Sequence, residues 1–321
     1  MYGWRHVVAS CTDPCREGNT RSKSHWRNNE PLREQQETAI GPSADGQRVN
    51  YCTISLTQRE LILTESSEDL LVEMNRDKEL ARLKPWAAKA QRFTGWDLSH
   101  VKPKPIEPGP AWNYEDLVRD YAVGKKYALD MGTGGAEFLS RVRHLLPPRT
   151  VATEEWKVNA PIAKRRLDPL DVDTVRCKSL KLPFASSAFD LVINRHEELD
   201  PEEVARVLST GGHVVTQQVG DNWSELRRFF PRAPDFSNLY PEYVRGFETV
   251  SLRLIQNIQH YYKVAYQGLG ELVYLLSVAP WEVPGFALER DLDALLSLES
   301  ELSKPQGLVL TESRFLIIAQ K

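Results

Sequence analysis

Apolar positions along the chain follow two different periods, and the change between them divides the sequence. From about residue 56 to residue 93, apolar residues recur every three to four positions among charged ones, as at Leu70, Leu71 and Met74. This spacing predicts an amphipathic helix. From about residue 125, short apolar runs alternate with helical segments. Short buried strands that alternate with helices predict a mostly parallel sheet.

The alternating part of the chain predicts a seven-stranded α/β fold with helices on both faces of the sheet. Strands are expected at residues 126–131, 150–154, 172–177, 189–194, 213–219, within 250–266 and at 314–320, with 308–310 as one option for a hairpin partner of the last. Helices are expected at residues 114–121, 136–146, 161–167, 201–210, 269–278 and 288–302. Asp200 and Pro201 illustrate a start signal, an N-cap followed by proline at the first helical position.

The part of the chain before the sheet divides into two segments. Residues 1–53 are polar and show neither a helical nor a strand period, which predicts a disordered leader. Residues 54–121 combine the helical pattern with a proline-rich connector at 103–110, and we expect them to form a helical cap over a ligand cleft. Residues 122–321 then form the α/β domain, with C-terminal insertions that are expected to cover the substrate.

Charge and hydropathy exclude some classes of partner. The 321 residues carry a net charge of −3, so no global positive field draws the chain to nucleic acid or to an anionic membrane. No apolar run approaches the roughly 18 residues of a membrane span, and no apolar secretory signal is visible. We expect a soluble cytoplasmic protein, and the sequence does not indicate its oligomeric state.

The four cysteines do not predict a structural disulfide or metal site. They lie at Cys11, Cys15, Cys52 and Cys177, three of them in the polar leader, which fits a reducing compartment. Zinc bound by the first three together with His25 would match no common ligand spacing. We therefore predict no metal site.

Residues 127–137 carry the main functional signal. They read Tyr-Ala-Leu-Asp-Met-Gly-Thr-Gly-Gly-Ala-Glu, a short apolar run that ends in Asp130, a glycine-rich turn and the start of a helical pattern. A strand, turn and helix of this kind bind nucleotides through backbone N–H groups at the start of the helix. The dinucleotide fingerprint requires a third glycine at position 137, where this chain has Glu137.

An acidic residue two positions before the first glycine instead resembles motif I of the class I S-adenosylmethionine-dependent methyltransferases, Asp/Glu-x-Gly-x-Gly-x-Gly. Ala136 stands at the third glycine and is also small enough for close helix–strand packing. Glu154 ends the second strand, as expected for that family. Residues 182–192 resemble its Leu-Pro-Phe-x-x-x-x-Phe-Asp-x-Val segment, and residues 202–212 resemble Glu-x-x-Arg-Val-Leu-x-Pro-Gly-Gly.

This resemblance covers roughly residues 112–230 and identifies the chain as a member of the Rossmann-like, small-molecule type of that family. It implies S-adenosylmethionine as cofactor, with Asp130 and the turn holding its methionine part and Glu154 its ribose. The residues expected to bind it are Asp130, Gly132, Thr133, Gly134, Gly135, Glu154, Trp156, Ser179, Leu180, Asn194 and Arg195. One departure is Lys178, where the family usually has the aspartate that binds the adenine amino group. Either Ser179 or a backbone carbonyl takes that contact, or cofactor affinity is reduced.

The resemblance places the acceptor beyond the fourth strand, where Asn194 is followed by Arg-His-Glu. The expected catalytic residues there are His196 and Glu197. His196 is the candidate general base because its unperturbed pKa lies near neutral pH, and a capping or packing role is the alternative. Arg195 is expected to pair either a substrate carboxylate or one of the acids Glu197 and Glu198.

The sequence thus predicts an enzyme that transfers a methyl group by in-line displacement to O, N or C of a small organic molecule. Aromatic residues outside the motifs, including Trp112 and Trp281, favour an enclosed apolar pocket, which Gln217 or Gln218 would also line. One alternative is a methyltransferase for RNA or another macromolecule, although the usual Asn-Pro-Pro-Tyr loop is absent. The other is a non-catalytic S-adenosylmethionine-binding protein.

Overall fold

The computed structural model describes residues 56–96 and 98–321, with side chains from residue 71 onward. The predicted leader therefore lies outside the described residues, and so does the cysteine and histidine set considered for zinc. The chain divides into two units, and Arg76–Lys321 belong to the larger one. Helix α1 (Leu56–Ala90) has residues in both units.

The larger unit is an α/β sheet structure. Its strands are β1 (Lys104–Pro105), β2 (Tyr127–Met131), β3 (Arg149–Glu154), β4 (Asp173–Arg176), β5 (Phe189–Arg195), β6 (Leu208–Val219), β7 (Arg253–Tyr266), β8 (Ser303–Lys304) and β9 (Gly307–Gln320). Its further helices are α2 (Tyr114–Ala122), α3 (Glu137–Val142), α4 (Ala160–Leu167), α5 (Pro201–Val207), α6 (Leu239–Thr249), α7 (Leu269–Val278) and α8 (Leu288–Leu302).

The strands form one sheet in the order β1-β7-β9-β6-β5-β2-β3-β4, with β8 paired to β9. Strands β6, β5, β2, β3 and β4 are parallel, and β9 runs antiparallel between β6 and β7. The described residues contain nine strands rather than the predicted seven. The two extra strands, β1 and β8, are only two residues long, too short to show an apolar period.

The hairpin considered between residues 308–310 and 314–320 does not form, and that option was wrong. Both segments belong to the single strand β9, whose middle residues Thr311, Glu312 and Ser313 pair with Lys263, Tyr262 and Tyr261 of β7. Polar residues in this middle stretch resemble a turn in sequence. Their pairing with β7 keeps them extended.

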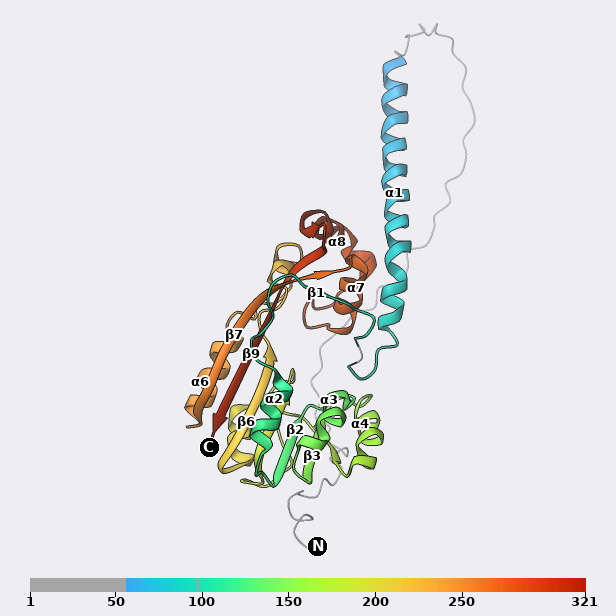
Figure 1. The fold of residues 1–321 in the computed structure, drawn as a ribbon. Helices are drawn as coiled ribbons and strands as arrows, with labels where there is room; N and C mark the ends of the chain where they lie inside the picture. Colours follow the sequence, from blue (N-terminus) through green and yellow to red (C-terminus); the bar gives the residue numbers. More distant parts are fainter. Residues whose placement is uncertain (1–55, 97) are drawn as a thin grey trace, which may run out of the picture. The chain divides into compact units, whose positions relative to one another are not determined.

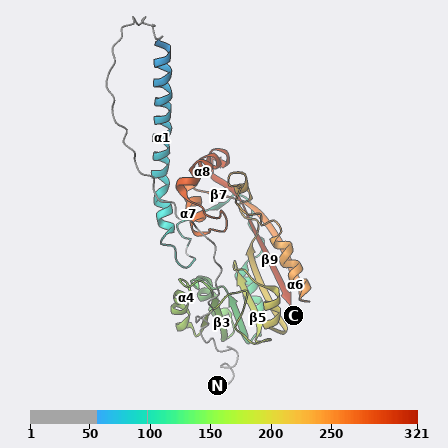
Figure 2. The same cartoon turned by 180° about the vertical axis from the view of Figure 1, so that it is seen from behind.

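Alternating residues of the strands face two separate helical layers, as predicted. Leu191 and Val215 share a cluster with buried residues of α2, α3 and α4, whereas Val192 and Val214 share one with α5 and α6. Figure 1 and the reverse view in Figure 2 show helices on both sides of the sheet. A side-chain period of two in the strands produces this division.

Helix α2 lies against the sheet, although its residues fall within the segment predicted to be a cap. Tyr114, Val118 and Ala122 recur every four positions and are buried. The side chain of Asn113 caps the helix by accepting hydrogen bonds from the backbone N–H groups of Glu115 and Asp116. The domain boundaries themselves stay a prediction.

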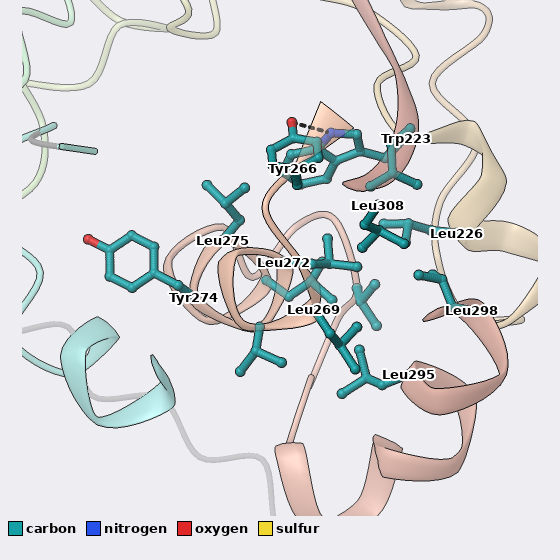
Figure 3. Packing of buried hydrophobic residues seen from close by; sticks show 14 of the residues in the cluster. Trp223, Leu226, Tyr266, Leu269, Leu272, Tyr274, Leu275, Leu295, Leu298 and Leu308 are labelled. Atoms are coloured by element: carbon teal, nitrogen blue, oxygen red, sulfur yellow. Dashed lines mark hydrogen bonds between the residues drawn. The ribbon is translucent and has the colours of Figure 1, made fainter. Parts of the chain in front are cut away.

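A third apolar cluster joins α7 and α8 to the ends of β7 and β9 (Figure 3). Leu272 of α7, Leu295 of α8 and Leu308 of β9 are almost completely buried there. Trp223 Nε1 donates a hydrogen bond to the hydroxyl of Tyr266 at 2.9 Å, which satisfies the indole N–H inside the cluster. The cluster supports the segments that extend beyond the carboxyl edge of the sheet.

We predict that Leu295→Ala lowers the free energy of unfolding by about 2–5 kcal/mol, because the change removes apolar contacts and leaves a cavity in this cluster. Urea unfolding followed by circular dichroism measures the effect. The matched control is Leu71→Ala in α1, where the leucine is exposed and the expected loss is below about 0.5 kcal/mol. Equal losses in the two variants would contradict the assigned packing.

Candidate functional site

The turn after β2 brings an acidic residue and a glycine-rich backbone together at the carboxyl edge of the sheet. Asp130 is buried near the end of β2, and Gly132 and Gly134 have φ angles of +70° and +63°. These left-handed conformations favour glycine. Ala136 adopts φ +63° as well, at a cost of about 1–2 kcal/mol for a residue with a Cβ atom. The third position of the motif therefore favours glycine because of its backbone conformation as well as because of its small size.

Glu154 at the end of β3 holds this turn. One carboxylate oxygen accepts a hydrogen bond from the Gly134 N–H at 2.7 Å, and the other accepts one from the Trp156 N–H at 2.8 Å. A carboxylate has about four acceptor positions, so further hydroxyl groups can bind to it. Burial raises the pKa of Glu154, and the two backbone hydrogen bonds oppose that rise.

The side chain of Glu197, predicted to be catalytic, lies along the turn. A Cβ atom on Gly132 would overlap with Glu197 Cγ, and the Ser179 hydroxyl donates a hydrogen bond to Glu197 Oε1 at 3.0 Å. Burial raises the pKa of Glu197 to about 7, and the charge of Glu154 contributes to the rise. The structure thus brings Glu197, which was expected to be catalytic, together with Ser179 and the glycine turn, which were expected to bind the cofactor.

A short segment after α1 also reaches the turn. A Cβ atom on Gly134 would overlap with the Trp96 ring, and the Gly95 N–H donates a hydrogen bond to Asn159 Oδ1 at 2.7 Å. Phe93 stacks near Trp156, with ring centroids 6.5 Å apart. Trp96 and Asn159 were not among the site residues predicted from the sequence. In the sequence, the only indication was that the aromatic residues Phe93 and Trp96 follow a predicted helix, and nothing indicated which residues they contact.

Asn194 positions the chain at the end of β5. This side chain is fully buried, donates from Nδ2 to the Met131 carbonyl at 3.3 Å, and accepts a hydrogen bond from the Thr216 hydroxyl at 2.8 Å. Gln218 Nε2 donates to Asn194 Oδ1 and also to the Glu197 carbonyl. Asn194 therefore ties β5 to β2 and β6, and its predicted contact with the cofactor stays a prediction.

The hydrogen bonds around His196 determine which ring nitrogen carries a proton. Trp112 Nε1 donates to Gln217 Oε1 at 2.8 Å, so the amide nitrogen of Gln217 faces His196 Nε2, 3.0 Å away. An amide nitrogen can only donate, hence Nε2 accepts and Nδ1 carries the proton. The surrounding protein and the charges of Arg314 and Arg195 hold the pKa of His196 below its usual range, although the side chain is exposed to solvent.

Neutral His196 therefore presents an N–H donor, and its lone pair is already engaged by Gln217. The backbone at this position has φ +63°, and its N–H donates to the Gln217 carbonyl at 2.8 Å. Gln217 thus contacts His196 twice and lines this part of the site. To act as a general base, His196 would first have to release Gln217. That predicted role stays a prediction.

Arg195 pairs with neither of the acids considered for it. Its guanidinium carbon lies 5.1 Å from the centroid of the Phe138 ring on α3. Within the part of the chain that the structure describes, Arg195 makes no hydrogen bond or ion pair, so neither Glu197 nor Glu198 neutralises it. The surrounding protein and the charges of Arg141 and Arg314 lower its pKa, although the side chain is exposed to solvent.

A family model described as a methyltransferase domain matches residues 129–216, which span β2 to β6 and include the glycine turn and Glu154. The chain therefore contains a methyltransferase domain over these residues. The protein is an enzyme that uses S-adenosylmethionine as methyl donor. No curated protein sequence matches the chain.

Several solved structures are similar to this methyltransferase. A putative methyltransferase from Bacillus halodurans is 14% identical, with 64% of this chain and 98% of that chain covered and a TM-score of 0.48. A functionally unknown protein from Deinococcus radiodurans is 13% identical, with 68% and 91% covered and a TM-score of 0.48. Geranyl diphosphate C-methyltransferase from Streptomyces coelicolor is 17% identical, with 64% and 77% covered and a TM-score of 0.41.

The residues at the turn fit S-adenosylmethionine. Thr133 is buried beside Asp130, and the glycines permit close approach to the backbone. Asp130, Glu154 and Glu197 are three carboxyl groups whose pKa values are raised by burial, to about 6 for Asp130 and about 7 for Glu197. A cationic sulfonium compound offsets that desolvation.

Lys178, which stands where an aspartate was expected, is turned toward an acid at the surface. Its ammonium group lies 3.8 Å from Glu155 in an exposed ion pair. The next residue, Ser179, is buried and its hydroxyl donates a hydrogen bond to Glu197. Leu180 is 44% exposed and Trp156 is 41% exposed, so both are accessible to a ligand's ring. The predicted adenine contacts of these residues stay predictions.

Glu282, in the loop between α7 and α8, was also not identified from the sequence. It is buried, and burial raises its pKa to about 7, while the charge of Arg314 opposes the rise.

Residues 56–96 and 98–321 contain no group of histidine, cysteine or acidic side chains placed to hold a metal ion. Over the same residues, no helix combines the length and apolarity needed to cross a bilayer.

We predict that Glu197 destabilises the ligand-free protein as pH rises from about 4.5 to about 7. Its pKa is about 7 in the folded protein and near the ordinary 4.5 when unfolded, so the folded state holds the extra proton in that window. Wild type should therefore lose on the order of 1–3 kcal/mol relative to Glu197→Gln between pH 5 and pH 8. Urea unfolding at both pH values measures this, with Glu198→Gln as control. A pH-independent difference between wild type and Glu197→Gln would refute the assignment.

Proposed function

We propose that this methyltransferase acts on a small organic molecule by in-line displacement at an O, N or C atom. The observation that carries the proposal is that the chain's own aromatic segments lie over the carboxyl edge of the sheet. Trp96 lies on the glycine turn, Trp112 is bonded to Gln217 at the end of β6, and Trp281 lies 6.2 Å from Trp96 between ring centroids. Segments in these positions leave room for a small acceptor more readily than for a macromolecule.

The chain's own residues have a limited chemical task. S-adenosylmethionine supplies a methyl group that is already activated by its sulfonium charge. The residues at the edge of the sheet need to bind the reactants, align them and exclude water. Asp130 and Glu154 provide negative charge beside the turn, and the aromatic segments exclude water. The network of Asn194 and Gln218 fixes the chain at the β5 end, where the acceptor is proposed to bind.

The donor-binding part of the proposal predicts that Asp130→Asn weakens S-adenosylmethionine binding by about 10- to 100-fold. The change removes a charge-assisted interaction of about 1.5–3 kcal/mol. Titration calorimetry measures the effect. Asp116→Asn is the control, because Asp116 is half-exposed on α2 and makes only a surface ion pair. Unchanged binding by Asp130→Asn would exclude the proposed donor site.

The acceptor part of the proposal has a separate test. We expect that a cell extract incubated with the protein and methyl-labelled donor yields label in the small-molecule fraction, identified by mass spectrometry. Asp130→Asn should reduce that label in parallel with its loss of donor binding. Label found only in RNA or in protein would refute a small-molecule acceptor while leaving the methyltransferase activity established.

A further inference from the structure

We propose that Asn159 is a positioning residue that holds residues 93–96 over the donor turn and thereby retains bound S-adenosylmethionine. Residues 93–96 follow α1, and their backbone is joined to Asn159, which lies 64 positions after Gly95 in the chain. This contact lies on the donor side of the site. Its effect is therefore independent of which acceptor the enzyme methylates.

One buried hydrogen bond, which we call the latch, joins Gly95 to Asn159. The Gly95 N–H donates to Asn159 Oδ1 at 2.7 Å, and both residues are buried. Asn159 stands at the N-cap position of α4, yet its side chain makes no capping hydrogen bond. Asparagine at an N-cap usually bonds to the first turn of its own helix. Here the side-chain oxygen is used for the distant segment instead.

The backbone of the segment is also fixed from a second side. Gly95 has a φ angle of +67°, and a Cβ atom there would overlap with Glu137 Oε1 at the start of α3. Arg166 of α4 lies 2.7 Å from the same carboxylate oxygen and holds it in place. The left-handed conformation and the close contact both favour glycine. The latch therefore seats the segment in a defined position.

The residues on either side of the latch lie against the donor site. A Cβ atom on Gly134 would overlap with the Trp96 ring, and the Gly134 N–H is the group that bonds to Glu154. On the other side, the Phe93 and Trp156 ring centroids lie 6.5 Å apart, with the ring planes at 23°. One short segment thus covers both the glycine turn and the residue expected beside the adenine.

The aromatic contacts of the segment are less directional than the latch. Trp96 is 44% exposed and contacts Trp281 at 6.2 Å between centroids, and Phe93 contacts Tyr274 at 6.4 Å. Ring contacts of this kind tolerate sliding, whereas a buried N–H that loses its acceptor is costly. The latch therefore determines how often the segment leaves the turn. A donor held between the two dissociates when the latch opens.

The two ends of the Asn159 side chain can be tested separately. Its amide nitrogen is buried without a hydrogen-bond partner among the described residues, so the oxygen is the end that holds the segment. Aspartate has a similar shape and keeps an acceptor oxygen, and the start of α4 favours negative charge. We expect Asn159→Asp to keep the latch and Asn159→Ala to break it.

The measurement is the dissociation rate of S-adenosylhomocysteine from the immobilised full chain, by surface plasmon resonance. Asn159→Ala should release it about tenfold faster than wild type, because the latch is lost. Asn159→Asp should stay close to the wild-type rate. Gly95→Ala is a second route to the same effect, since its Cβ atom would overlap with Glu137 and strain the backbone. Circular dichroism checks that each variant is folded.

Asn222→Ala is the matched control. Asn222 is also buried, and its Oδ1 accepts a hydrogen bond from the backbone N–H of Ser313 on β9 at 3.1 Å. It should lower the free energy of unfolding while leaving the dissociation rate unchanged. A wild-type rate in Asn159→Ala and Gly95→Ala would overturn the proposal. Equal acceleration by Asn222→Ala would show a general loss of stability, and an Asn159→Asp rate equal to that of Asn159→Ala would refute the latch.

Discussion

The hydrogen bond from the Gly134 N–H to the Glu154 carboxylate connects the two halves of the donor site. It joins the end of β3 to the turn after β2, and it keeps a carboxyl group buried beside a backbone that only small residues tolerate. Because β2 is also paired with β5, the position of the turn sets where Glu197 and Arg195 lie relative to it. The pairing of β2 with both β3 and β5 therefore positions the residues on both sides of the turn.

The acids beside the turn are unfavourable to ionise in the ligand-free protein. Burial raises the pKa values of Asp130, Glu154 and Glu197. A cationic ligand at the turn offsets that desolvation, because it stabilises the charged form of each carboxyl group. The same residues therefore disfavour the empty site and favour a positively charged donor.

Sequence alone predicted the parts of the fold that depend on local pattern. The strand before Asp130, the strand that ends at Glu154 and the helices on both faces follow from apolar periods and start signals. The contact of Trp96 with Gly134 and the placement of Arg195 over Phe138 join residues far apart in sequence, so no local pattern indicates them. Likewise, the polar middle of β9 reads as a turn until its partner in β7 is known. The assigned roles of His196 and Glu197 depend on hydrogen bonds that only the folded structure reveals.

The position of β9 has a consequence for how the protein is made. This strand follows all the other described strands in the chain, yet it lies between β6 and β7, pairing with β7 along most of its length and with β6 over residues 314–320. Until residues 307–320 leave the ribosome, β6 and β7 have no strand between them, and the sheet exists as two separate parts. Pairing over such sequence distances is slow, since the intervening loops must close first. β6 can pair with β5 before then, but β7 joins the sheet only once β9 has been synthesised.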